Sequence, residues 1–183
     1  MDNVLDRPWT TESFLAWEDR QEGKHEFDGR DVIRMAGGSY AHQRIVINLW
    51  IALANLLRGR PFLPAQEMRL RIGRRIRYPD VVVCATALDQ TTRTLTDAVA
   101  IFEVLSDDTA ATDRVTKLAD YADVASARVY VLLEQTKIAA TMFRREAGGP
   151  WVASPHTACG LELPSLNVTL PLAAVYEGLT FPA

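Results

Sequence analysis

The sequence is poor in cysteine and lacks long apolar runs. Its two cysteines, Cys84 and Cys159, stand alone among 183 residues, which excludes a disulfide framework and shows no zinc-ligand spacing. Cys84 ends the apolar run 81–83, so we expect it to be buried and reduced. No apolar run approaches the ~20 residues that a membrane-spanning helix needs. The first residues lack the basic and apolar regions of a signal peptide, and we therefore expect a cytoplasmic protein.

Lysine is the scarcest charged residue of the chain. Of the 20 basic residues, 17 are arginine and three are lysine, namely Lys24, Lys117 and Lys137. With 23 acidic residues the formal net charge is −3, so the chain lacks the basic excess typical of a nucleic-acid-binding domain. Arginine and lysine are not interchangeable at a site. The three positions that keep lysine are therefore candidates for a role that needs a compact ammonium group.

Repeats, low-complexity tracts, linkers and glycine-rich phosphate loops are also missing. A hydrophobic share of 48% and a charged share of 23% are ordinary for a globular protein, and the length predicts one domain over residues 1–183. No order of nucleophile, histidine and acid stands out. A small-molecule enzyme therefore has little support, and no small-molecule cofactor is expected.

Hydrophobic periodicity predicts a mixed α/β (α+β) domain. We expect a first helix from Thr10 or Thr11, with Thr11 as its cap, and a hairpin over 25–35 around Asp28-Gly29. Further helices are predicted at 39–58, 110–124 and 172–177, and strands at 62–72, 76–84, 99–105, 129–133, 138–145, 151–154 and near 168. The strand–helix–strand run 99–133 predicts a parallel crossover. The result is a twisted central sheet with helices on its faces and hairpins at its edges.

Two acids lie where apolar strands are predicted. Asp80 opens the run 81–83, and Glu103 interrupts the run 99–105. A buried carboxylate is costly unless it is paired or binds a metal, so each acid either pairs with an arginine, lies at an edge, or serves a site. If the two strands are neighbours, both carboxylates and the carbonyl of Val104 can hold one hard cation such as Mg²⁺.

The helix predicted after Glu103 carries Lys117. Asp113 and Tyr121 lie four residues to either side, so the three residues share one helical stripe. One interpretation is a surface pair between Asp113 and Lys117, of small energetic value. The other is a lysine that stabilises charge on a phosphate beside a metal.

Five arginines crowd into nine residues where the predicted strands 62–72 and 76–84 meet: Arg69, Arg71, Arg74, Arg75 and Arg77. A turn tipped with arginine that leads to Asp80 is typical of a phosphate-contacting element, which predicts nucleic-acid binding. The alternatives are an edge strand protected by charge from aggregation, or a set of salt bridges to the acidic excess.

The order Tyr78-Pro79-Asp80, then Phe102-Glu103-Val104-Leu105-Ser106, then Asp113 with Lys117 and Tyr121, resembles the PD-(D/E)XK nuclease superfamily. More closely, the chain resembles the Uma-type branch, a bacterial family labelled "putative restriction endonuclease". The segments 24–29 and 39–42 are similar to the family's hairpin and to the start of its long helix, so the likeness spans residues 10–135.

The resemblance implies a restriction-endonuclease-like fold and a DNA endonuclease that depends on Mg²⁺ or Mn²⁺. It implies Asp80, Glu103 and the Val104 carbonyl as metal ligands, with Glu26 as an additional acid; otherwise Glu26 pairs with an arginine or with Lys24. The superfamily's lysine two residues after the second acid is absent, and the Uma-type branch implies that Lys117 takes this role.

Three expectations remain open at this point. His42 either caps the long helix or approaches the metal site, and we favour a structural or secondary role.

The tail leucines 161, 163, 166 and 170 form either a sheet edge or the surface of a homodimer. A homodimer would suit a nuclease that cuts both strands of DNA, because one small domain cuts one strand. The acids Asp107 and Asp108 and the net charge motivate a second hypothesis, a non-catalytic module that binds nucleic acid or protein.

Overall fold

The computed structural model of the chain describes residues 8–105, 110–157 and 159–181, without the side chains of 110–114. Its largest element is a six-stranded sheet with the order β11-β10-β9-β8-β6-β3. The strands are β3 (Leu63–Gln66), β6 (Val81–Cys84), β8 (Ala100–Val104), β9 (Val129–Leu133), β10 (Ala140–Arg144) and β11 (Val152–His156). β8 and β9 are parallel and are joined by helix α3 (Ala110–Ala122), which confirms the predicted crossover.

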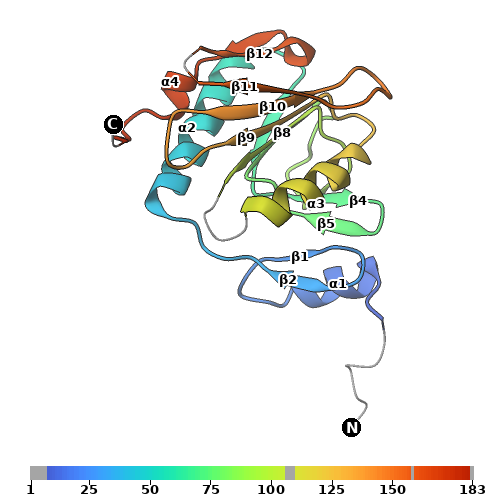
Figure 1. The fold of residues 1–183 in the computed structure, drawn as a ribbon. Helices are drawn as coiled ribbons and strands as arrows, with labels where there is room; N and C mark the ends of the chain where they lie inside the picture. The colour runs from blue at the N-terminus through green and yellow to red at the C-terminus, as the bar shows by residue number, and fades with distance from the viewer. Residues whose placement is uncertain (1–7, 106–109, 158, 182–183) are drawn as a thin grey trace.

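Helices cover both faces of this sheet (Figure 1). The long helix α2 (Tyr40–Leu56) packs on one face, where it shares a core with Phe102 of β8 and with the C-terminal segment. α3 covers the other face, where Tyr121 packs among Ile101 and the ring of Tyr130. Successive side chains of a strand alternate between faces, so Glu103 shares the α3 side with Ile101.

A second sheet lies beside the first, with the order β2-β1-β5-β4-β7. Its strands are β1 (His25–Phe27), β2 (Val32–Arg34), β4 (Arg69–Ile72), β5 (Arg75–Arg77) and β7 (Thr94–Leu95). The hairpin of β1 and β2 confirms the prediction for 25–35, and Gly29 supplies the positive φ of 97° in its turn. Helix α1 (Thr11–Glu18) closes this region by stacking Phe14 on Phe27 at 5.2 Å between ring centroids.

Both predicted strands at 62–72 and 76–84 are in fact split between the two sheets. β3 leaves the large sheet at Glu67, whose φ of 47° turns the chain into β4 of the small sheet. The chain then returns from β5 to β6 through Tyr78-Pro79-Asp80. Apolar alternation did not reveal these crossings because the backbone on either side of each crossing is extended. Asp80 consequently lies at the junction of the sheets.

Helix α1 begins at Thr11, as predicted, but its cap is not the predicted residue. Thr10 is its N-cap and accepts a hydrogen bond from Ser13 N at 3.1 Å, whereas the hydroxyl of Thr11 donates to Arg74 O at 2.8 Å. The predicted cap was one residue late, because two adjacent threonines offer the same signal.

The C-terminal segment belongs to the main core. It forms β12 (Leu161–Leu163), a 3-10 turn (Pro164–Leu166), β13 (Val168–Leu170) and α4 (Leu172–Val175). The tail leucines 161, 163, 166 and 170 are all fully buried in the α2-side core, so their side chains do not form a dimer surface. Leu161, Leu163 and Leu170 lie in the two-stranded sheet of β12 and β13, in which each strand is an edge, as the other expectation has it. Within the described ranges, no helix combines the length and apolarity required to cross a bilayer.

Candidate active site

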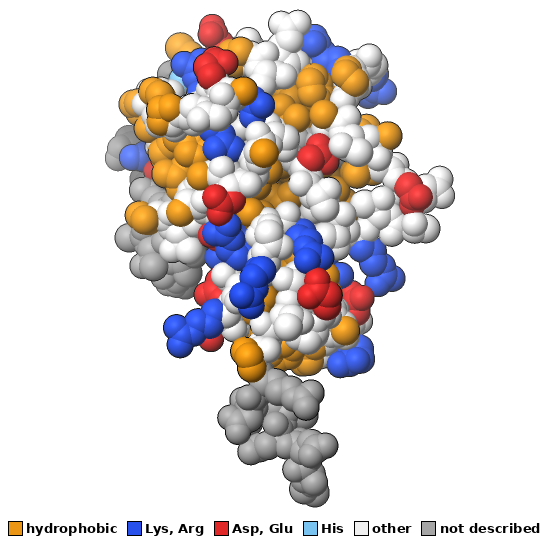
Figure 2. Space-filling model, turned by 90° about the vertical axis from the view of Figure 1, so that its right-hand side faces the viewer, with side chains coloured by type: hydrophobic (Ala, Val, Ile, Leu, Met, Phe, Trp, Pro, Cys, Tyr) orange, Lys and Arg blue, Asp and Glu red, His pale blue; other side chains and the backbone are white. Residues whose placement is uncertain are grey.

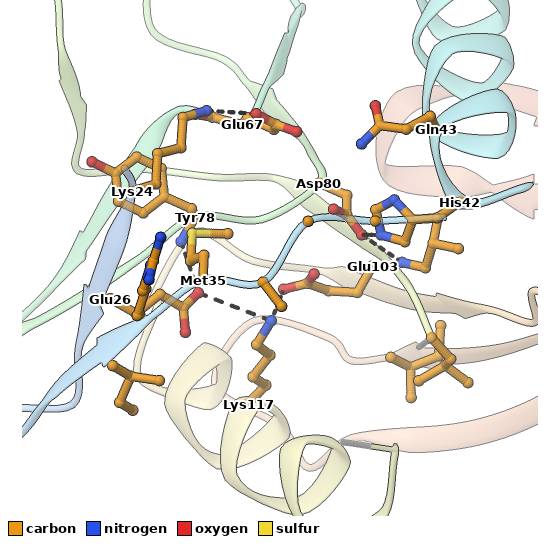
Figure 3. A pocket seen from close by; sticks show the side chains of 18 of the residues that line it. Lys24, Glu26, Met35, His42, Gln43, Glu67, Tyr78, Asp80, Glu103 and Lys117 are labelled. Carbon is orange, nitrogen blue, oxygen red and sulfur yellow. Dashed lines mark hydrogen bonds and ion pairs between the residues drawn. The ribbon is translucent and has the colours of Figure 1, made fainter. Parts of the chain in front are cut away.

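A cavity of about 510 Å³ opens where the two sheets, α2 and α3 meet. Its walls come from the β1–β2 hairpin, the segment 35–38, the first turn of α2, the two crossings between the sheets, the end of β8, β9, and Lys117 of α3. The charged and titratable side chains that line it are Lys24, Glu26, Arg34, His42, Glu67, Tyr78, Asp80, Glu103, Lys117 and Tyr130. Figure 3 shows Asp80, Glu103 and His42 converging, with Lys117 extending from α3 toward Glu103.

The sheet register brings Asp80 and Glu103 together. β6 and β8 are antiparallel neighbours with Val81 opposite Phe102, which places the preceding Asp80 beside Glu103. Asp80 Oδ2 accepts a hydrogen bond from the backbone N–H of Val104 at 2.7 Å. The two carboxylates are buried, with 8% and 6% of their residues' surface exposed. The prediction that both acids come from adjacent strands is confirmed.

Lys117 pairs with Glu103 and approaches Glu26. Its Nζ lies 3.0 Å from Glu103 Oε1 and 3.9 Å from Glu26 Oε1. One turn later on α3, the hydroxyl of Tyr121 donates to the same Glu103 oxygen at 2.6 Å. Burial alone would lower the pKa of Lys117, but the carboxylates of Glu103 and Glu26 outweigh it and raise that pKa. Lys117 is therefore a protonated ammonium held inside the pocket.

Glu103 is poised between its ionised and protonated forms. Burial raises its pKa, Lys117 opposes this, and the nearby charge of Asp80 adds to the rise, so that the pKa reaches about 7. One lysine therefore does not fully compensate the negative charge of the pocket. A bound cation would favour the ionised form.

Glu26 enters the pocket from β1, and its position meets both expectations made for it. Its Oε1 accepts from the backbone N–H of Tyr78 at 3.1 Å, and its Oε2 accepts from Arg77 at 2.8 Å. Lys24 does not pair with it, because that ammonium lies 2.5 Å from Glu67 Oε2 at the rim. Glu26 is thus a buried, arginine-paired acid that still faces the cavity.

His42 is closer to the site than we expected. Ser39 caps α2, and the Nε2 of His42 lies 3.3 Å from Asp80 Oδ2. The hydrogen bond with Asp80 raises the pKa of His42, although burial opposes it. A Cβ on Gly38 would stand 2.6 Å from Nδ1, so the ring fits only against glycine. The side chain of His42 therefore belongs to the pocket, and only its backbone N–H takes part in the helix cap, by donating to Ser39 Oγ.

The donor set fits a hard divalent cation bound by few protein ligands. Asp80 and Glu103 offer carboxylate oxygens, and Val104 lines the same wall. In the part of the chain that the structure describes, no cluster of three or more His, Cys, Asp or Glu side chains is spaced to hold a metal by itself. Mg²⁺ needs no such cluster, because it keeps several waters and takes one or two carboxylates.

Four of the five clustered arginines are engaged with acids. The ion pairs join Arg69 to Glu18 and Asp19, Arg71 to Glu12, Arg75 to Asp120 and Asp123, and Arg77 to Glu26 and Asp120. Arg77 is 3% exposed, so its assignment to nucleic-acid binding is wrong. Arg74 is exposed at the turn. Figure 2 shows basic and acidic side chains interspersed on the face turned to the viewer, as the salt-bridge alternative predicts.

Other predicted residues have mixed outcomes. The side chain of Asp113 and the residues 106–109, which include Asp107 and Asp108, lie outside the described part of the chain. Leu105 lines the pocket where the superfamily has its lysine. Sequence reasoning missed the structural role of Asp120, three residues after Lys117. Its position on the same helical stripe was the available signal.

Comparisons with known proteins agree with this architecture. The Uma2 family model, described as "Putative restriction endonuclease", matches residues 11–178. "Uncharacterized protein slr1290" of Synechocystis is 30% identical over 175 residues, covering 93% of this chain and 92% of that protein. "Uncharacterized protein sll1609" of the same organism is 30% identical over 132 residues, covering 69% of this chain and 75% of that protein.

A solved structure shares the fold. The crystal structure of "a putative nuclease belonging to DUF820" from Anabaena variabilis matches with a TM-score of 0.77 at 15% identity, covering 92% of this chain and 98% of that one. At this identity the likeness concerns the fold alone. Together with the family match over residues 11–178, it confirms the resemblance seen in the motifs: the chain belongs to the Uma2 family of restriction-endonuclease-like proteins.

Proposed function

We propose that this protein is a metal-dependent endonuclease that hydrolyses phosphodiester bonds of DNA. One observation carries the proposal: three buried carboxylates, those of Glu26, Asp80 and Glu103, converge with the ammonium of Lys117 on one cavity. Charged groups are costly to bury. Their concentration at a solvent-reachable cavity is typical of a catalytic site.

In this proposal Asp80, Glu103 and the Val104 carbonyl hold Mg²⁺ or Mn²⁺. When bound, the cation supplies activation of a water molecule and neutralises charge on the scissile phosphate. The N–H of Val104 and the ring of His42 fix Asp80 Oδ2, which leaves Oδ1 for the cation. Tyr121 and Lys117 hold Oε1 of Glu103 and leave Oε2.

Lys117 is the group we assign to the phosphate. Its ammonium stays protonated at neutral pH because the carboxylates around it raise its pKa. A fixed cation 3.0 Å from a ligand carboxylate needs little reorganisation to stabilise negative charge as it develops on phosphate oxygens. Glu26, 3.9 Å away, keeps the ammonium oriented and remains available to assist a second cation.

Cleavage assays with matched variants test the assignment. Purified wild type is incubated with plasmid and with short duplexes in Mg²⁺ or Mn²⁺, beside Asp80→Ala and Lys117→Ala. Lys137→Ala is the control, because Lys137 is exposed and does not line the cavity. We expect cleavage by wild type and the control, and loss of cleavage in the two site variants. Equal cleavage by all four proteins would identify a contaminant and refute the assignment.

The engaged arginines support a second candidate, a non-catalytic module with a nuclease fold. Four of five cluster side chains are committed to carboxylates, which leaves less free positive charge for DNA than the sequence suggests. Calorimetric titration separates the two functions. Measurable affinity for Mg²⁺ or Mn²⁺ that depends on Asp80 favours the nuclease, and no affinity favours the module. A homodimer remains a proposal that sedimentation would test.

A further inference from the structure

The guanidinium of Arg77 lies behind the wall of the cavity without lining it. It donates from NH1 to Glu26 Oε2 at 2.8 Å and from Nε to Asp120 Oδ2 at 2.7 Å. The residue stands in β5 and is 3% exposed. One buried side chain thus ties β5 to β1 and to α3.

Asp120 is held from two sides. Arg77 occupies its Oδ2, and Arg75 NH1 lies 2.6 Å from its Oδ1. Asp120 is itself 4% exposed, so both of its oxygens are paired inside the protein. Two arginines of one strand therefore fix one residue of α3.

The position of Asp120 on α3 matters for the pocket. Lys117, Asp120 and Tyr121 follow the i, i+3, i+4 spacing and so lie on one face of the helix. A helix held at Asp120 cannot rotate or slide without moving its neighbours on that face. The contacts of Lys117 and Tyr121 with Glu103, at 3.0 and 2.6 Å, depend on that setting.

The same guanidinium fixes Glu26. Arg77 takes Oε2, and the backbone N–H of Tyr78 takes Oε1, so the carboxylate is bound at both oxygens. Oε1 then lies 3.9 Å from the ammonium of Lys117. Two chains of contacts therefore connect Arg77 with Lys117. One runs through Asp120 and helix α3, and the other runs through Glu26.

A purely structural ion pair is the alternative explanation. Buried ion pairs add little net stability, and apolar residues of similar volume often replace them without loss. Stability alone therefore does not account for a doubly paired arginine at this place. Both of its partners lead directly to pocket residues, which a positioning role explains.

We propose that Arg77 is a positioning residue, which holds Glu26 and, through Asp120, sets α3 so that Lys117 reaches Glu103. Its predicted effect on turnover rests on the proposed nuclease function. Its effect on the placement of Lys117 does not, so the two can fail separately.

The scarcity of lysine makes the placement measurable. With three lysines in the chain, ¹⁵N-lysine labelling gives at most three side-chain ammonium signals in an NMR spectrum. Lys117 is shielded and paired, whereas Lys137 is exposed. We expect a persistent Lys117 signal in wild type, assigned by its loss in Lys117→Met.

The variants are Arg77→Met, Arg77→Lys and Asp120→Asn, with Arg145→Met as the control. Arg145 binds carbonyls at and beyond the C-terminal end of α3, including Ala122 O at 2.8 Å, so its replacement loosens the same end of the helix without touching Arg77 or Asp120. We expect the Lys117 signal to shift or vanish in the Arg77 and Asp120 variants and to stay in Arg145→Met. If Arg77→Met does not fold, the milder Arg77→Lys and Asp120→Asn decide the question.

Turnover supplies the second readout. If wild type cleaves DNA, Arg77→Lys should lower kcat on the order of 100-fold with KM little changed, as for a displaced catalytic group. If wild type does not cleave, the proposed function fails and the NMR signal still tests the positioning role. An unmoved Lys117 signal in folded Arg77→Lys and Asp120→Asn would overturn the inference.

Discussion

Replacing Tyr121 with phenylalanine removes one hydroxyl and keeps the ring. Tyr121 is fully buried, and its hydroxyl donates to Glu103 Oε1 at 2.6 Å. A hydrogen bond to a charged group contributes about 1.5–3 kcal/mol. Glu103 keeps Lys117 at 3.0 Å after the change. We therefore expect the free energy of unfolding to fall by about 1.5–2 kcal/mol, at the lower end of that range.

Urea denaturation at pH 8 measures this loss. At that pH Glu103, with its pKa of about 7, is mostly ionised, so the hydrogen bond has a charged acceptor. Thermal unfolding gives a second measurement. For a chain of this length a loss of 1 kcal/mol lowers Tm by about 2–4 °C, so the Tm of Tyr121→Phe should fall by about 3–8 °C. Tyr40→Phe is the matched control, since Tyr40 is 73% exposed, and its change should stay within about 0.5 kcal/mol.

Comparing the stabilities of the two variants tests whether the hydroxyl of Tyr121 binds Glu103. If Tyr121→Phe is as stable as Tyr40→Phe, with an unchanged denaturant slope, the hydroxyl does not bind a buried carboxylate. Glu103 would then not face α3, and the geometry of the whole site would be wrong.

Two further predictions concern the pocket wall and the cysteines. Gly38→Ala places a Cβ 2.6 Å from the ring of His42, so we expect a loss of about 1–3 kcal/mol in urea denaturation. Gly37→Ala, which meets nothing within 4 Å, should cost far less, and equal losses would contradict the close approach. Burial raises the pKa of Cys84 to about 12, so at pH 8 its thiol is protonated and should resist a disulfide reagent until urea unfolds the chain. Exposed Cys159 should react at once, and a second fast equivalent in native protein would contradict this.

The elements with a clear period were predictable from the sequence. Helix α2 follows its apolar spacing, and the β8–α3–β9 crossover follows from an apolar strand on each side of an amphipathic helix. The division into two sheets was not predicted, because Glu67 turns the chain without a glycine or a proline at the turn, and the shift of the apolar positions from 63 and 65 to 68, 70 and 72 is a weak signal over so few residues. A positive φ at a glutamate leaves no sequence signal.

The site shows the same contrast. Asp80 and Glu103 could be predicted as site residues because a carboxylate in an apolar strand is unexpected. Lys117 could be predicted because lysine is scarce in this chain and because Lys117 lies on the helix that follows Glu103. Arg77 was misassigned. A run of alternating arginines has the same pattern whether it faces phosphate or faces acids, and its buried partners Glu26 and Asp120 come from distant parts of the chain.

The most direct test of the central claim is a calorimetric titration with Mn²⁺ of wild type, Asp80→Asn and Lys117→Met. We expect Mn²⁺ to bind to wild type, not to bind to Asp80→Asn, and to bind to Lys117→Met at least as tightly as to wild type. The last result is expected because removing an ammonium 3.0 Å from Glu103 removes repulsion of the cation. Unchanged Mn²⁺ affinity in Asp80→Asn, or no affinity in wild type, would contradict the account.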